Sequence, residues 1–191
     1  MEIHQQTHST NDFIRGWYID NKNICDEIVN YHKNSNEKMP GQSGGEVRPD
    51  VKESTDVILD DAHLYFEYNK ELQKATDAYG DIYPYVHYYA AWTVLEDINI
   101  QKYDPGKAYY GAHCERGSIE MPMAVRHMVF MTYLNDVEEG GETEFIHQGI
   151  KVKPEKGLTL IWPADWTFTH RGIVAPNEEK YIATGWYSFI N

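Results

Sequence analysis

The sequence predicts a mainly β protein in which two N-terminal helices support a C-terminal β-core. Before residue 95, two stretches carry apolar residues at helical spacing. After it, short segments rich in β-branched and aromatic residues follow one another, separated by turn signals such as DPG, EEGGE and KPEKG. Successive short strands with no helix between them are typical of a sandwich, a jelly roll or a barrel.

The two expected helices lie on either side of a long polar segment. The first falls within residues 18–34, where Asp20 or Asn21 can cap its N-terminus. The second covers residues 62–80 and is expected to end at Gly80. Its apolar face consists of Tyr65, Tyr68, Leu72, Ala75 and Tyr79.

The polar segment between the helices, residues 33–54, is rich in glycine, asparagine, serine and charged residues. Loops of this length are often lids or binding segments. A mobile loop that closes over a bound ligand and a disordered surface insertion are both consistent with its composition.

The expected strands occupy the segments 93–103, 126–135, 142–146, 149–153, 157–162 and 180–189. The length of 191 residues fits one domain with a substantial core. We therefore expect a single domain over 1–191, with helical support and a mobile loop in 1–95 and the β-core in 96–191.

The composition argues against two classes of partner. With 17 basic and 30 acidic residues the formal net charge is −13, which disfavours docking to nucleic acid or to anionic membranes. No apolar run approaches the ~20 residues that span a bilayer, and the polar first residues lack a signal core. Neither cysteine belongs to a Cys-x-x-Cys pair. We expect a soluble, cytoplasmic protein of undetermined oligomeric state.

The stretch YYGAHCERGS contains a histidine and a glutamate two residues apart, His113 and Glu115. In a strand, residues i and i+2 point to the same side, so both side chains can reach one ion. His170 can complete a two-histidine, one-carboxylate set, which holds iron and leaves positions open for substrate and oxygen. Spacing alone leaves the alternative of unrelated polar residues near a turn.

Lys180 follows His170 by ten residues and opens the last expected strand, where it shares a face with Ile182, Thr184 and Trp186. A lysine that points into a β-core needs an anion, because an unpaired buried ammonium is costly. A dicarboxylic co-substrate bound to iron at one end would supply that anion. An exposed lysine at a strand start is the alternative.

The stretches YDPGKAYYGAHCE, RHMVFMTYLNDVEEGGETEF and HRGIVAPNEEKYIATGW occur in this order within residues 97–189. Together they resemble the 2-oxoglutarate- and Fe(II)-dependent dioxygenases, and within them the prolyl 4-hydroxylase branch. This resemblance implies a double-stranded β-helix, the jelly-roll fold of the cupins. It also implies the cofactor Fe(II), the co-substrates 2-oxoglutarate and O2, and ascorbate as reductant.

The resemblance also assigns site residues. It implies that His113, Glu115 and His170 bind iron, with no catalytic residue beyond these ligands. It implies that Lys180 binds the distal carboxylate of 2-oxoglutarate with help from the Tyr103 hydroxyl.

Two further positions match the family. Trp186 stands where the family keeps a pocket-wall tryptophan, and Arg126 matches an arginine that the prolyl-hydroxylase branch uses near its peptide. A surface arginine at a strand end is the alternative for Arg126. The chain departs from the family at Glu115, since the usual pair is His-x-Asp. Because a carboxylate is retained there, we expect hydroxylation rather than halide transfer.

The function implied is hydroxylation of prolyl residues in a peptide or protein, with release of succinate and CO2. A dioxygenase acting on a free amino acid or another small molecule, and a non-catalytic β-helix protein that binds metal or ligand, are the alternatives.

Overall fold

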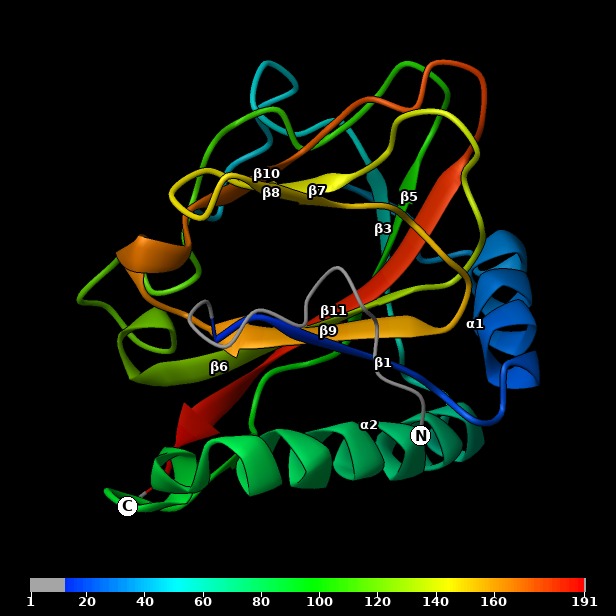
Figure 1. Cartoon of the computed structure of the whole chain (residues 1–191). Coiled ribbons are helices and arrows are strands. Elements are labelled where there is room, and N and C mark those ends of the chain that lie inside the picture. The colour runs from blue at the N-terminus through cyan, green and yellow to red at the C-terminus, as the bar shows by residue number, and fades with distance from the viewer. Residues whose placement is uncertain (1–12, 191) are drawn as a thin grey trace.

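The structure, a computed structural model, describes residues 13–190 and contains two β-sheets (Figure 1). The larger sheet has the order β1-β9-β6-β11-β5-β3-β2, and β4 also pairs with β11. Its strands are β1 (Arg15–Tyr18), β2 (Met39–Pro40), β3 (Thr55–Ile58), β4 (Trp92–Val94), β5 (Asn99–Tyr103), β6 (Arg126–Tyr133), β9 (Leu158–Pro163) and β11 (Lys180–Phe189). The smaller sheet has the order β10-β7-β8, with β7 (Thr143–Phe145), β8 (Ile150–Val152) and β10 (His170–Gly172). The two sheets confirm the expected double-stranded β-helix.

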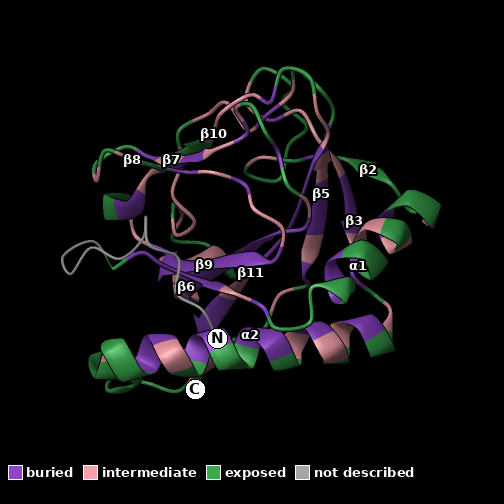
Figure 2. Ribbon diagram, turned by 45° about the vertical axis from the view of Figure 1, so that its right-hand side comes forward, coloured by how far each residue is buried: buried purple, intermediate pink, exposed green. Residues whose placement is uncertain are grey.

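Two α-helices, α1 (Asn23–Asn34) and α2 (Ala62–Ile82), lie against the outer side of the larger sheet (Figures 1 and 2). Short 3-10 turns are η2 (Pro84–His87), η3 (Met123–Val125) and η4 (Trp166–Phe168). No helix within residues 13–190 is long and apolar enough to cross a membrane.

The helix ends differ from the sequence prediction. The N-cap of α1 is Lys22, with no side-chain cap, so the prediction of Asp20 or Asn21 was wrong. Asp20 instead forms an ion pair with Lys74 of α2 at 2.8 Å. α2 does not end at Gly80 but continues to Ile82, so that prediction was wrong too. The glycine instead makes room for the His87 ring, since a Cβ there would lie 2.3 Å from Nε2 of His87.

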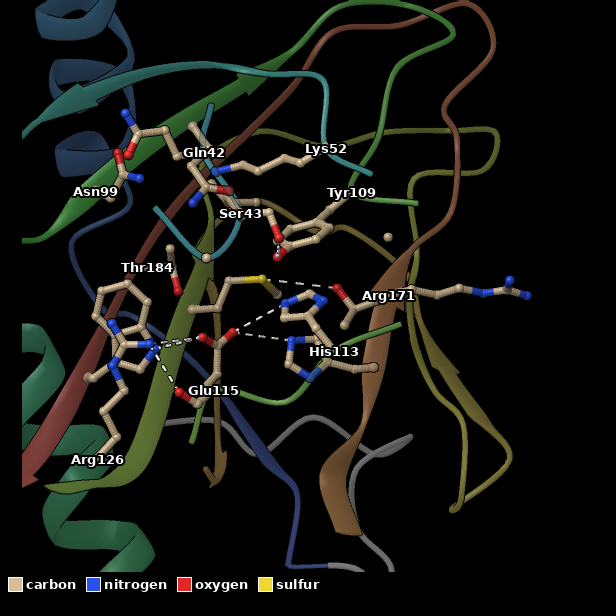
Figure 3. A pocket seen from close by; sticks show the side chains of 18 of the residues that line it. Gln42, Ser43, Lys52, Asn99, Tyr109, His113, Glu115, Arg126, Arg171 and Thr184 are labelled. Atoms are coloured by element: carbon tan, nitrogen blue, oxygen red, sulfur yellow. Dashed lines mark hydrogen bonds and ion pairs between the residues drawn. The ribbon is translucent and has the colours of Figure 1, made fainter. Parts of the chain in front are cut away.

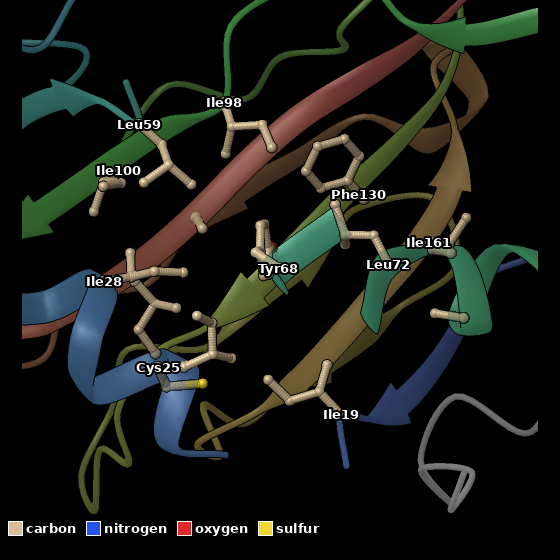
Figure 4. Close-up of a cluster of buried hydrophobic side chains, with 14 of the residues drawn as sticks. Ile19, Cys25, Ile28, Leu59, Tyr68, Leu72, Ile98, Ile100, Phe130 and Ile161 are labelled. Atoms are coloured by element: carbon tan, nitrogen blue, oxygen red, sulfur yellow. The ribbon is translucent and has the colours of Figure 1, made fainter. Parts of the chain in front are cut away.

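A first apolar core lies between the helices and the larger sheet (Figure 4). Tyr68 and Leu72 of α2 and Ile28 of α1 are 0%, 1% and 0% exposed and pack there with Phe130 of β6 and Ile100 of β5. Burial of such side chains contributes ~1.5–3 kcal/mol each. The helices thus cover one face of the sheet and leave the other for the pocket.

A second apolar core fills the space between the two sheets. Alternate residues of β6 separate the cores, since Phe130 faces the helices while Val129 and Met131 face the smaller sheet. Trp162 of β9 and Phe145 of β7 close this inner core. The face of the larger sheet that points toward the smaller sheet is therefore apolar where it forms this core. The rest of that face can carry the polar groups of the pocket.

The N-terminal half contributes more to the sheet than its sequence pattern indicated. Strands β1, β2, β3 and β4 all lie before residue 96, and β3 pairs with β5 over four residue pairs, from Thr55↔Lys102 to Ile58↔Asn99. Within 33–54, α1 runs on to Asn34, β2 follows, and an isolated bridge joins Lys52 to Tyr109. That segment is thus anchored at several points.

Candidate metal centre

Two histidines far apart in sequence meet through their backbones. His113 and His170 form an isolated antiparallel bridge, with His113 N donating to His170 O at 3.0 Å and His170 N donating to His113 O at 2.9 Å. Gly172 N donates to Tyr109 O at 2.8 Å, which continues the pairing along β10. The residues before Glu115 therefore run beside β10 and bring both imidazoles to one place.

The three residues of the expected iron site form one cluster (Figure 3). The ligand atoms of His113, Glu115 and His170 all lie within 4.8 Å of one another, and no other such cluster of three or more metal-ligating side chains occurs among residues 13–190. Oε1 of Glu115 lies 3.4 Å from Nε2 of His113 and 3.5 Å from Nε2 of His170. These are the donor types of the two-histidine, one-carboxylate sites that hold iron.

The other nitrogen of each imidazole has a backbone partner. Nδ1 of His113 lies 2.9 Å from the carbonyl oxygen of Gly111, and Nδ1 of His170 lies 2.9 Å from that of Phe168. A proton on Nδ1 satisfies each carbonyl and leaves the Nε2 lone pair to face Glu115. The cluster therefore fits a divalent metal.

Burial and neighbouring groups set the ionisation states of the cluster. Burial lowers the pKa of His170, as does the nearby His113 ring. Burial disfavours the charged form of Glu115, but its interactions with the neighbouring imidazoles of His113 and His170 outweigh that effect and hold its pKa well below the usual value. A neutral imidazole beside an ionised carboxylate is the state that binds a metal cation.

Lys180 lies in the same pocket and is 4% exposed. Its ammonium donates to the carbonyl oxygen of Gly141 at 3.0 Å and forms no ion pair with any residue that the structure describes. Burial lowers the pKa of Lys180 to about 8, against a smaller opposing effect of Glu142. A buried cation without an anionic partner suits the carboxylate of a ligand.

Tyr103 is close to Lys180 but its hydroxyl points elsewhere. The two residues are register partners on β5 and β11, and the Lys180 ammonium lies 5.0 Å from the centre of the Tyr103 ring. The Tyr103 hydroxyl donates to Oε1 of Gln101 at 2.6 Å. The ring packs beside the cation, and the predicted hydroxyl contact with a ligand stays a prediction.

Trp186 and Arg126 both reach the metal cluster. The indole nitrogen of Trp186 donates to Oε2 of Glu115 at 2.9 Å, and the Arg126 guanidinium carbon lies 3.6 Å from the Trp186 ring centre. Arg126 is 9% exposed and forms an ion pair with Glu96. It is therefore not the surface residue of the alternative interpretation, and its role toward a substrate stays a prediction.

All seven predicted site residues line one pocket of about 390 Å³. One wall of this pocket was missed by the sequence analysis. Lys52, which is 3% exposed, donates to Oδ2 of Asp56 at 2.7 Å, and the Asn99 amide donates to the same oxygen at 3.0 Å. The alternation of Asn99, Gln101 and Tyr103 on one face of β5 was the available signal. For Lys52, which lies in the 33–54 segment, the sequence offered no such signal.

Comparisons with known proteins agree with this geometry. The family model described as the 2OG-Fe(II) oxygenase superfamily matches residues 98–188. The chain is 31% identical over 115 residues to "Probable prolyl 4-hydroxylase 9" of Arabidopsis thaliana, covering 48% of this chain and 40% of that protein. It is 30% identical to "Prolyl 4-hydroxylase 13" of the same plant, covering 42% of it. The chain thus spans less than half the length of these relatives.

Solved structures share the fold. A viral collagen prolyl hydroxylase from Paramecium bursaria Chlorella virus-1 superimposes with a TM-score of 0.69 at 20% identity, over 94% of this chain and 98% of that one. A Pseudomonas putida prolyl-4-hydroxylase gives a TM-score of 0.71 at 15% identity, over 93% and 94%. A Trichoplax adhaerens prolyl hydroxylase, solved with a peptide fragment of hypoxia inducible factor, gives a TM-score of 0.72 at 16% identity. The match covers 94% of this chain and 84% of that one.

Proposed function

We propose that the chain is an Fe(II)- and 2-oxoglutarate-dependent dioxygenase that hydroxylates prolyl residues of a peptide or protein, since the model of the 2OG-Fe(II) oxygenase superfamily matches residues 98–188. One observation carries this proposal. The only cluster of three metal-ligating side chains within residues 13–190 shares its pocket with a buried lysine that has no anionic partner among these residues.

The residues present define what each part of the pocket would hold. His113, Glu115 and His170 would hold Fe(II), and Lys180 would hold the distal carboxylate of 2-oxoglutarate. When bound, iron with 2-oxoglutarate and O2 supplies the oxidising chemistry, with succinate and CO2 as products and ascorbate as reductant. The chain itself supplies orientation and a dry environment.

Aromatic rings shield the cluster from water. The Tyr109 ring stacks on His113 with a centroid distance of 3.8 Å, and the Trp162 ring meets His170 edge-on at 5.1 Å. Phe145 contacts His170 from the smaller sheet at 5.6 Å. Exclusion of water strengthens the electrostatic interactions within the pocket and limits side reactions.

The proposal of a peptidyl substrate rests on the relatives. The curated relatives are named as prolyl 4-hydroxylases, and one structural neighbour was solved with a peptide. In this chain, Ser43–Gly45, Pro122 and Met123 also line the pocket, and a peptide would contact them.

The test measures succinate. Purified protein with Fe(II), ascorbate and O2 should convert 2-oxoglutarate to succinate, and a panel of proline-containing peptides should increase turnover and gain one oxygen atom by mass spectrometry. Lys180→Ala should raise the 2-oxoglutarate requirement sharply, whereas Lys107→Ala, at a half-exposed lysine paired with Glu53, should not. Absence of succinate with every peptide and with every free amino acid in the same screen would favour a non-catalytic metal-binding protein.

The polar wall favours a second candidate. Lys52 and Asn99 line the pocket and both donate to Asp56, so this wall carries an ammonium and an amide group that suit a free amino acid or another small polar molecule. Oxygen gain on free amino acids but on no peptide in the same screen would select this candidate.

A further inference from the structure

The two carboxylate oxygens of Glu115 lie in different surroundings (Figure 3). Oε1 faces Nε2 of both His113 and His170, at 3.4 and 3.5 Å. Oε2 faces the opposite way, where it accepts from the indole nitrogen of Trp186 at 2.9 Å and lies 3.6 Å from Nη1 of Arg126. Both of these neighbours are donors without a lone pair to offer a cation.

Arg126 is itself held in place. Its Nε and Nη2 donate to the two oxygens of Glu96 at 2.8 and 2.5 Å, which is a bidentate pair. Its Nη1 donates to the backbone carbonyl of Glu115 at 3.0 Å. The guanidinium also stacks over the Trp186 ring at 3.6 Å. Arg126 and Trp186 therefore hold both the main chain and the side chain of Glu115 in place.

A glutamate at this position needs contacts that fix its carboxylate more than an aspartate would. The extra methylene adds a rotatable bond and allows the carboxylate to turn so that both oxygens reach one ion. Such a rotation of the carboxylate would break the contacts of Oε2 with Trp186 and Arg126. Oε2 would then occupy a coordination position on the metal that the co-substrates need.

We propose that Trp186 and Arg126, braced by Glu96, are positioning residues that restrict Glu115 to binding the metal through Oε1 alone. We name these three residues the Glu115 clamp. This inference rests on the proposed metal site and goes beyond it, since it assigns the clamp a task that the shorter aspartate would not require.

The test follows Co(II), which fits the same ligands and reports its coordination number in its visible absorption. Trp186→Phe keeps an aromatic ring at this position but removes the N–H donor. We expect it to weaken Co(II) binding by about tenfold, in the range seen for hydrogen-bond partners of metal ligands, and to change the absorption intensity. The matched control is Trp166→Phe, at a tryptophan that is 67% exposed and outside the pocket. It should change neither quantity.

A double-mutant cycle with Glu115→Asp separates clamping from general support of the fold. The shorter side chain cannot fill the same contact with the indole N–H while it binds the ion. Trp186→Phe should therefore change Co(II) affinity by less than about twofold in the Glu115→Asp background, and the two substitutions should be non-additive. Equal effects in both backgrounds would overturn the proposal.

A second variant covers the case in which Trp186→Phe does not fold. Arg126→Gln removes the stacking cation and the contact with Oε2, and it should produce the same change in the Co(II) spectrum. The thermal unfolding midpoint of each variant shows whether it is folded. Normal Co(II) binding and spectra in both variants would reject the clamp and leave the metal site intact. Failure of the unmodified protein to bind Co(II) would instead reject the proposed function.

Discussion

The Nε2 atoms of His113 and His170 both face the same Glu115 oxygen because the two backbones exchange a pair of hydrogen bonds, at 3.0 and 2.9 Å. The bridge fixes the distance between two side chains that come from distant parts of the sequence. The pair is therefore built by strand pairing.

The first prediction concerns this pair. His170→Ala removes one of three ligands and should weaken Mn(II) or Co(II) binding by at least about 100-fold in a titration monitored by calorimetry. His147→Ala is the matched control, because His147 is exposed and contacts Trp166 rather than the cluster. Unchanged binding in His170→Ala would remove His170 from the ligand set.

The second prediction concerns pH. Burial lowers the pKa of Lys180 to about 8, so its ammonium is charged below that pH and neutral above it. A dicarboxylate needs the charged form. The dissociation constant of 2-oxoglutarate for the Mn(II)-loaded protein should therefore stay level below pH 7 and rise by up to about tenfold per pH unit above pH 8.

The control for this pH dependence is Lys180→Arg. A guanidinium stays charged throughout this range, so the steep loss of affinity above pH 8 should disappear even if the affinity itself is lower. An equally steep loss in Lys180→Arg would assign the titration to another group.

The third prediction concerns packing of the sheet. A Cβ on Gly185 would lie 2.4 Å from the Phe130 ring, which is fully buried in the core between the helices and the larger sheet. Gly185→Ala should therefore destabilise the protein by about 1–3 kcal/mol in denaturant unfolding. At Gly117 the nearest atom would be 3.5 Å away, so Gly117→Ala should change stability by less than about 0.5 kcal/mol.

The fourth prediction concerns the segment 33–54. The Tyr109 hydroxyl lies 2.7 Å from Oγ of Ser43 and ties this segment to the pocket wall. Tyr109→Phe keeps the ring on His113 but removes that bond, which is worth about 1 kcal/mol. Hydrogen exchange at residues 43–46 should become about fivefold faster. Tyr110→Phe, whose hydroxyl makes only a 3.4 Å contact with Gly106, should leave exchange unchanged.

Much of the β-core could be predicted from the sequence. The strand segments after residue 95 were recognisable because enrichment in β-branched and aromatic residues between turn signals is a local property. The same reasoning placed Lys180, Ile182, Thr184 and Trp186 on one face of β11, and all four line the pocket. The helix N-cap at Lys22 was not predictable, since Asp20 is drawn to Lys74 of another helix.

The sequence by itself determined the mainly β class, the two helices and the types of residue available to bind a metal and a carboxylate. Only the tertiary structure decided how they meet. Lys52 lines the pocket and donates to Asp56, whose strand β3 pairs with β5, and Glu96 meets Arg126 across a loop. Such contacts join residues distant in sequence, and their geometry depends on strand register and burial, which no local pattern encodes.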